Sequence, residues 1–144
     1  MLTISPRRWR RIRWLTACIA LVGCARPVSP GYTGLPVYAV DVTGGARQCV
    51  ASHPQLMAGR TVDATMSVAN DGGWCAISVQ LDGQPYASGL LTEPPARGKV
   101  YIHPVGNFTR IDYTPDAGFS GTDRFVVQLI PGNPVLRTTV TVTH

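Results

Sequence analysis

From about residue 60 onward, apolar and polar residues alternate with the two-residue period of a half-buried β-strand. Six runs show the pattern, with apolar positions falling within Val62–Val68, Ile77–Leu81, Val100–Ile102, Ile111–Tyr113, Phe125–Leu129 and Leu136–Val142. After the second run, Asp82-Gly83 predicts a hairpin turn, because this glycine tolerates positive φ. No convincing helix follows the N-terminal region. We therefore expect at least six short strands in an all-β fold, a single antiparallel sandwich.

A second pattern marks the N-terminus, where five arginines precede the apolar run Trp14–Gly23, as in a secretory signal. Ten helical residues span only about half of a bilayer core, so this run is too short to be a transmembrane helix. The run ends in Leu21-Val22-Gly23-Cys24, which resembles the lipobox of bacterial lipoproteins. The resemblance implies cleavage before Cys24 and a diacylglyceryl group on its thiol. The alternative is an ordinary signal with a chance cysteine.

These features divide the chain into a signal peptide (1–23), a lipidated N-terminus and linker (24–36) and a sandwich domain (37–144). The linker is rich in proline and glycine and has no periodicity. Several acyl chains hold a protein stably to a membrane. In such lipoproteins an aspartate at the position of Ala25 favours retention in the inner membrane. We therefore expect this protein to be anchored in the outer membrane, facing the periplasm. Arginine pairs also suggest a twin-arginine signal, but further arginines stand where that motif needs apolar residues, which favours the general export route.

The net charge of +5 comes from the leader. Of the thirteen Lys and Arg residues, five precede the apolar run and eight follow Cys24, where they are matched by eight Asp and Glu residues. The processed protein is therefore about neutral, and its basic residues are scattered among acidic ones. Phosphate binding needs clustered cations, so we exclude nucleic acid as a partner.

Two cysteines, Cys49 and Cys75, remain in the processed domain after Cys24 is assigned to lipid. Thiols outside the cytosol usually pair, and Cys75 shares the phase of the apolar positions that follow it. We expect a structural disulfide that closes a loop of about 25 residues and stabilises the fold by about 3–4 kcal/mol. A redox or metal role is the alternative, but the chain lacks a CxxC spacing and a nearby histidine pair.

The C-terminal third carries a more specific pattern, Tyr113-Thr-Pro-x-x-Gly118-Phe-x-Gly121-Thr-Asp-x-Phe125, followed by a closing Thr139–Val142 strand. About the last 50 residues resemble the bacterial Ig-like, cadherin-like repeats of cell-surface proteins. The resemblance implies an Ig-like sandwich. Within the motif, Asp116 can cap a turn through its side chain, and the glycines permit backbone angles closed to other residues. Unlike tandem family members, this chain has one copy.

Candidate chemistry is sparse. His53 and His103 are the histidines other than the terminal one, and no GxSxG, HExxH or phosphate-binding loop occurs. An enzyme would need a pocket that gathers one of these histidines with carboxylates; we predict no catalytic residues, no metal and no cofactor. Calcium is the alternative to test, because Asp112, Asp116 and Asp123 are close in sequence.

The run Asn70–Trp74 could present Trp74 to a partner; the alternative is a turn in which Trp74 covers the sheet. We expect a lipid-anchored cell-envelope protein, not an enzyme, whose Ig-like module binds an envelope protein or a surface component. Its partners would be the membrane, through the lipid, and that component. The alternative is a periplasmic enzyme inhibitor or chaperone-like accessory protein. The link from fold to binding is analogy.

Overall fold

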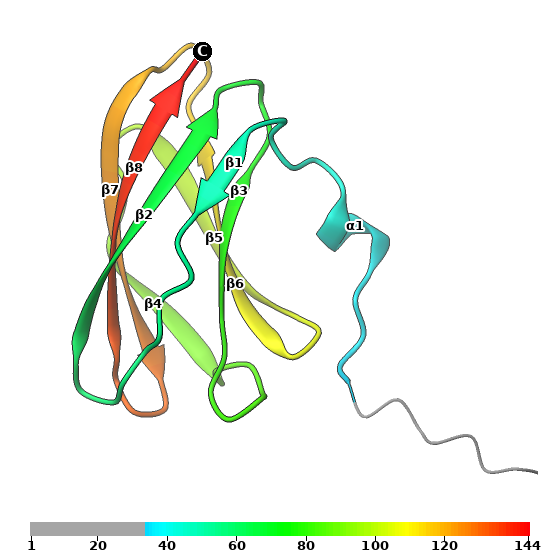
Figure 1. The fold of residues 1–144 in the computed structure, drawn as a ribbon, viewed down its shortest axis with the longest axis vertical. Helices are drawn as coiled ribbons and strands as arrows, with labels where there is room; N and C mark the ends of the chain where they lie inside the picture. The colour runs from blue at the N-terminus through cyan, green and yellow to red at the C-terminus, as the bar shows by residue number, and fades with distance from the viewer. Residues whose placement is uncertain (1–33) are drawn as a thin grey trace, which may run out of the picture. The chain divides into compact units, whose positions relative to one another are not determined.

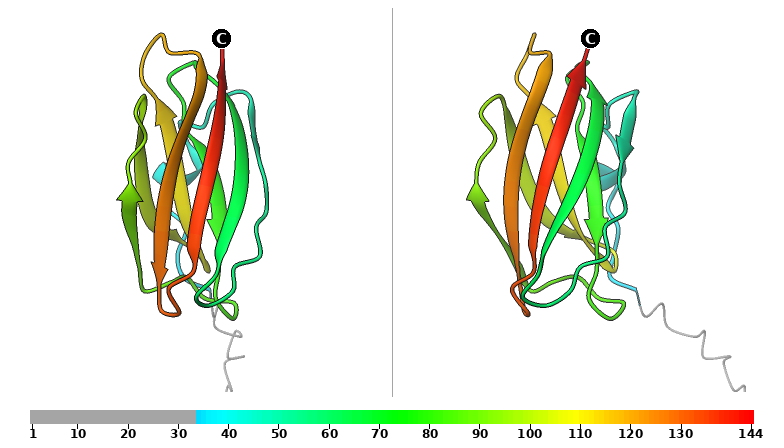
Figure 2. Two further views of the ribbon diagram at one scale, coloured as in Figure 1. Left: turned by 90° about the vertical axis from the view of Figure 1, so that its left-hand side faces the viewer. Right: turned by 60° about the vertical axis from the view of Figure 1, so that its left-hand side comes forward.

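The structure is a computed structural model that describes residues 34–144; the expectations for the signal peptide and Cys24 lie outside the described residues. Two sheets stack face to face (Figures 1 and 2). The five-stranded sheet has the order β1 (Cys49–Ala51), β2 (Thr61–Ala69), β8 (Val135–Thr143), β7 (Gly121–Ile130) and β4 (Ser88–Glu93). The three-stranded sheet has the order β3 (Cys75–Val79), β6 (Phe108–Pro115) and β5 (Gly98–Val105). The all-β sandwich is confirmed.

The core lies between the sheets and is built from the apolar positions of the alternating runs. Val68, Phe125 and Val140 enter it from the five-stranded sheet, and Ile77 and Ile111 enter it from the three-stranded sheet. Because residues two apart in a strand share one face, each run buries its apolar side and leaves the other side outward. The faces of the strands therefore follow the sequence pattern.

Strand direction is where the antiparallel expectation is partly wrong. β2 and β8 pair in parallel along nine residues, whereas the other strand pairs are antiparallel. The two strands are far apart in sequence, so no tight turn forces them to run in opposite directions. The sheets thus contain five and three strands, and β2 with β8 is their one parallel pair among the described residues.

The Asp82-Gly83 turn forms, but it does not make the expected hairpin. Asp82 and Gly83 both have positive φ, 50° and 77°, and Leu81 and Gln84 exchange backbone hydrogen bonds of 2.8 and 3.0 Å. However, β3 before the turn and β4 after it belong to different sheets. The turn therefore carries the chain across the sandwich.

The turn after β6 is closed differently from the expectation. We expected the Asp116 side chain to cap it, but its closing bond joins the backbone N of Phe119 to the carbonyl oxygen of Asp116, at 3.1 Å. The side chain of Asn70 then donates to both the Asp116 and the Phe119 carbonyls, at 2.8 Å each. Gly118 and Gly121 have positive φ, as predicted. The motif thus receives its polar contact from a distant loop.

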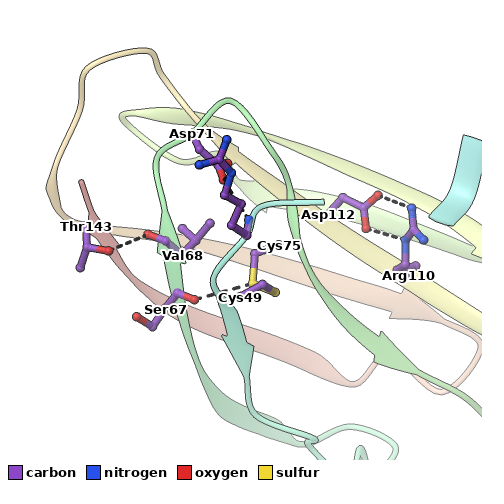
Figure 3. The surroundings of a disulfide bond; sticks show 9 residues. Cys49, Ser67, Val68, Asp71, Cys75, Arg110, Asp112 and Thr143 are labelled. Atoms are coloured by element: carbon purple, nitrogen blue, oxygen red, sulfur yellow. Dashed lines mark hydrogen bonds and ion pairs between the residues drawn. A yellow bond between two sulfur atoms is a disulfide. The ribbon is translucent and has the colours of Figure 1, made fainter. Parts of the chain in front are cut away.

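The disulfide forms as predicted between Cys49 in β1 and Cys75 in β3 (Figure 3). Their Cα atoms are 5.2 Å apart, within the usual range for a disulfide. Cys75 is fully buried. Because β1 belongs to the five-stranded sheet and β3 to the three-stranded one, the bond ties the two sheets together.

Asp123 is a buried carboxylate that holds the loop before β5. It accepts hydrogen bonds of 2.9–3.0 Å from the backbone N of Ala96, Arg97 and Arg124, and from the Tyr113 hydroxyl. Burial by itself would raise the pKa of Asp123, but these donors outweigh burial and lower the pKa below its usual value. Burial, aided by the bond to Asp123, raises the pKa of Tyr113.

The Asp123 carboxylate should account for part of the acid sensitivity of the fold. Because the pKa of Asp123 is lower in the folded than in the unfolded chain, its contribution is complete above about pH 4, the unfolded pKa, and is lost as the pH falls through the folded pKa. Asp123→Asn should destabilise the protein at neutral pH and weaken the dependence of stability on pH below about 4. Urea denaturation across pH measures both.

Asp63→Asn is the matched control, because the side chain of Asp63 is 77% exposed. That variant should keep the acid dependence of the wild type. An unchanged acid profile in Asp123→Asn would contradict the assignment.

Candidate functional site

The outer face of the three-stranded sheet carries a cluster of polar and aromatic side chains. In β5 and β6 the outward positions are Tyr101 and His103, and Arg110 and Asp112. The strand register pairs Tyr101 with Asp112 and His103 with Arg110. The outward positions of the two strands therefore meet side by side.

Arg110 and Asp112 form a bidentate ion pair at the centre of the cluster (Figure 3). Arg110 Nε and Nη2 donate to the two carboxylate oxygens at 2.7 and 2.8 Å, and both side chains are less than 10% exposed. The guanidinium also lies over the Trp74 ring, 4.2 Å from its centroid, in cation–π geometry. The arginine is thus held on two sides.

An N-terminal segment, residues 34–45, crosses this face; we call it the strap. It is attached first at the β5–β6 turn, where Leu35 N donates to Asn107 Oδ1 at 3.1 Å. Its other end is attached at Trp74, whose backbone N donates to the Gly44 carbonyl and whose Nε1 donates to the Thr43 carbonyl. These bonds attach both ends of the strap to the sandwich.

Between these attachments the strap contains the short helix α1 (Ala39–Val42), which lies outside the β3–β6–β5 sheet (Figure 1). Asp41 in α1 points toward the cluster and is buried. Its backbone carbonyl accepts a hydrogen bond from Arg110 Nη1, and one carboxylate oxygen accepts a 2.8 Å bond from Tyr38 N. Arg110 therefore joins the middle of the strap to the sheet.

His103 lies between the two carboxylates. Its Nε2 is 3.0 Å from Asp112 Oδ2, its Nδ1 is 3.8 Å from Asp41 Oδ1, and its side chain is 14% exposed. Tyr101 packs on it, with the ring centroids 4.5 Å apart. The imidazole thus has a polar neighbour on each ring nitrogen.

Under the strap these residues line a pocket of about 410 Å³, together with Val40, Thr43, Gly44 and Trp74. A histidine beside a carboxylate can activate a nucleophile. Serine and cysteine do not occur among the described residues that line the pocket, and the hydroxyl groups there belong to Thr43 and Tyr101. Arg110 uses Nε, Nη1 and Nη2 within the protein, so the pocket has the features of a structural ion-pair cluster.

The outward side of the strap is apolar. The exposed fraction is 75% for Val40, 67% for Val42 and 63% for Tyr38, and Leu35 and Val37 are also exposed. Asp41 is the one Asp, Glu, Lys or Arg residue between positions 34 and 45, and it points inward. The strap thus covers a buried ionic cluster, and its exposed large side chains are uncharged and apolar; one of them, Val40, stands at the edge of the pocket.

The predicted site residues fall in different places. Cys24 lies outside the described residues. Trp74 is half-buried, stacks against the Arg110 guanidinium and lines the pocket. His53 is exposed just after β1 and does not line this pocket, whereas His103 is gathered with carboxylates, as an enzyme would require.

The three aspartates weighed for calcium have different neighbours. Asp112 pairs with Arg110, Asp123 accepts from backbone amides, and Asp116 is exposed. Across residues 34–144, no three His, Cys, Asp or Glu side chains gather in a way that could hold a metal ion.

The cluster formed by Asp41, His103 and Arg110 was not predicted from the sequence. A usable signal existed for two of these residues. The two-residue turn Gly106-Asn107 between alternating runs is typical of a hairpin, and this turn sets the register that aligns His103 with Arg110. No local signal places Asp41 there, because it is 69 residues from Arg110.

The close approach of Gly73, just before β3, to Ala46, just after the strap, predicts the effect of a small substitution. A Cβ atom at the buried Gly73 would lie 2.3 Å from Ala46 N and 2.5 Å from Ala46 Cα, both backbone atoms. Gly73→Ala should therefore push the end of the strap away and lower the free energy of unfolding by about 2 kcal/mol. Urea denaturation and hydrogen exchange at the Ala46 amide measure this.

Gly45→Ala is the control for this substitution. Its Cβ atom would meet the Trp74 ring at 3.6–3.8 Å, which is ordinary contact. This variant should behave nearly as wild type. Equal stability of the two variants would show that the close approach at Gly73 is unimportant.

No family model and no curated protein matches the sequence of this chain. None of the helices between residues 34 and 144 has the length and apolar character needed to cross a membrane.

Proposed function

We propose that this protein is a lipid-anchored component of the bacterial cell envelope, whose sandwich is a non-catalytic binding module. The contact surface is the strap, together with the neighbouring outward side chains of β5. The observation that carries the proposal is the run of exposed, uncharged apolar side chains from Leu35 to Val42. Exposed apolar surface of this kind is typical of interaction sites.

The ionic cluster beneath the strap supports a binding role better than a catalytic one. The charged groups of Arg110 and Asp112 face each other, and Asp41 holds the strap over them. A catalytic site would leave an acid, a base or a nucleophile facing the substrate. Here the same groups attach the strap, and this attachment keeps its apolar side outward.

The anchor supports the proposal from the sequence side. The Leu21–Cys24 motif would place lipid on Cys24, and ten residues, 25–34, separate it from Leu35. At about 3.3–3.6 Å per residue, these residues reach at most about 35 Å. The tether would hold the contact surface near the membrane, within reach of envelope components.

Intact-mass analysis of membrane-extracted protein tests the anchor. The wild type should begin at Cys24 and carry added acyl mass, and Cys24→Ser should lose that mass. A soluble, unlipidated wild-type protein would contradict the anchor and favour a freely secreted module.

Site-specific photocrosslinking in living cells tests the contact surface. A photoreactive amino acid at position 40 should give adducts, whereas the same group at position 139, an exposed outward position of β8, should give few. Equal labelling at the two positions would contradict a contact surface on the strap.

A further inference from the structure

We infer that the partner of the strap is the lipid surface that holds Cys24, and that this contact sets the orientation of the sandwich on the membrane. The inference rests on the proposed function, because it needs the anchor. In this arrangement the exposed side chains of residues 35–42, together with Tyr101, lie at the headgroup boundary of the bilayer.

The chemistry of the strap fits a bilayer interface. Its outward side chains are aliphatic at Val37, Val40 and Val42 and aromatic at Tyr38. Aliphatic side chains gain free energy from the acyl boundary, and a tyrosine keeps its hydroxyl among the headgroups. Tyr101, 65% exposed, lies beside Val40 at the same pocket and adds a second ring of this kind.

The distribution of charge on and near the strap is also compatible with contact to a lipid surface. Burying a carboxylate in lipid is expensive, and the one carboxylate of the strap, Asp41, points away from solvent toward Arg110 and His103. Lys99, which is exposed on the same outward face of β5 as Tyr101, supplies a cation where anionic headgroups would lie.

The position of the strap in the chain selects lipid over a soluble partner. The strap begins at residue 34, the first residue that the structure describes, so among the described segments it lies nearest in sequence to the proposed acyl chains on Cys24. Tethering by a short segment of chain gives the attached segment an effective concentration of about the millimolar range. A contact too weak to hold the free domain on a membrane is therefore populated once Cys24 supplies the attachment.

The attachments of the strap to the sheet fix the orientation of the sandwich on the membrane. Leu35, Arg110 and Trp74 attach the strap to the sheet at its start, middle and end. Such an attachment transmits the orientation of the strap to the sandwich. The outer face of the five-stranded sheet, on the opposite side of the sandwich, then points away from the membrane and stays available to the envelope.

Spin labels on the full-length, lipidated protein test the inference. Val40→Cys and Thr139→Cys are labelled separately, and the proteins are reconstituted into vesicles of phosphatidylethanolamine and phosphatidylglycerol. The label at position 40 should show a several-fold loss of collisions with a water-soluble nickel chelate and a gain of collisions with oxygen. The label at position 139 should stay accessible to the chelate.

A second substitution tests the apolar contact itself. Val42→Asp in the Val40→Cys background should restore access of the chelate while the protein stays attached. Val50→Asp is the matched control, because Val50 in β1 is 71% exposed and lies outside the strap. That control should leave position 40 protected.

The outcomes separate the inference from the function on which it rests. A lipid-attached protein whose label at position 40 stays accessible to the chelate would overturn the inference and leave the anchor standing. If the label at position 40 stayed protected from the chelate in detergent, and protection depended on protein concentration, the strap would contact a second copy of the protein. If photocrosslinking at position 40 gave adducts with a protein, the strap would contact that protein. Either result would overturn the inference. Failure to attach at all would overturn both proposals.

Discussion

Arg110→Ala should lower the free energy of unfolding by about 3–5 kcal/mol, the usual cost of removing one partner of a buried ion pair. The substitution leaves the Asp112 carboxylate, which is 8% exposed, without its bidentate donor. It also removes the bond to the Asp41 carbonyl and the contact over Trp74. Urea denaturation followed by circular dichroism measures the loss.

The exposed pair of Arg137 and Asp63 is the matched control. Arg137 Nη1 lies 3.3 Å from Asp63 Oδ1, and the two side chains are 56% and 77% exposed. Arg137→Ala should cost about 0–1 kcal/mol, because water screens such pairs. If Arg110→Ala also cost less than 1 kcal/mol, the cluster would not be what holds this face together.

A local measurement distinguishes attachment of the strap from general stability. In Arg110→Ala, hydrogen exchange should accelerate first at Asp41 and Trp74, whose amides are bonded within the strap and to it. Amides in β7 and β8 should exchange with the global unfolding of the domain. Uniform acceleration across all strands would contradict a specific role for Arg110 in holding the strap.

Replacing both Cys49 and Cys75 with alanine should cost about 3–4 kcal/mol. The two cysteines are 26 residues apart, and in the chain-entropy model a loop of this size restricts the unfolded chain by about that amount. The bond also joins β1 to β3 across the two sheets. Losing it should therefore weaken the whole sandwich.

Urea denaturation of the double variant and of wild type, with and without reductant, measures the effect of the disulfide. Reduced wild type should approach the stability of the double variant, because both lack the bond. A double variant as stable as oxidised wild type would show that the disulfide contributes little to folding.

Local sequence pattern was sufficient for the faces of the strands. Alternation indicated which side of each run is buried, because a strand places alternate side chains on opposite sides whatever its neighbours are. The disulfide was predicted from the same pattern, because Cys75 shares the phase of the core and the expected lipidation of Cys24 left Cys49 as its partner. The positive φ at Asp82 and Gly83 is likewise a property of two adjacent residues.

Two strands, β1 and β4, could not be predicted from alternation. β4 is an edge strand with both leucines exposed, Leu90 at 49% and Leu91 at 37%. With neither face buried it has no alternation to detect. β1 has three residues and is held by pairing with β2 and by the disulfide. Both strands exist because of their neighbours, which a local pattern does not show.

The sequence by itself determined which side chains face the core of this protein, which cysteines pair and where its turns need unusual backbone angles. Only the tertiary structure decided that β2 runs parallel to β8 and that Asp41 meets Arg110 and His103 beneath the strap. The physical reason is the separation along the sequence between the residues that interact. Alternation and turn chemistry act between adjacent residues, whereas the ion-pair cluster joins positions 69 residues apart, which only the completed packing of the strap on the sheet brings together.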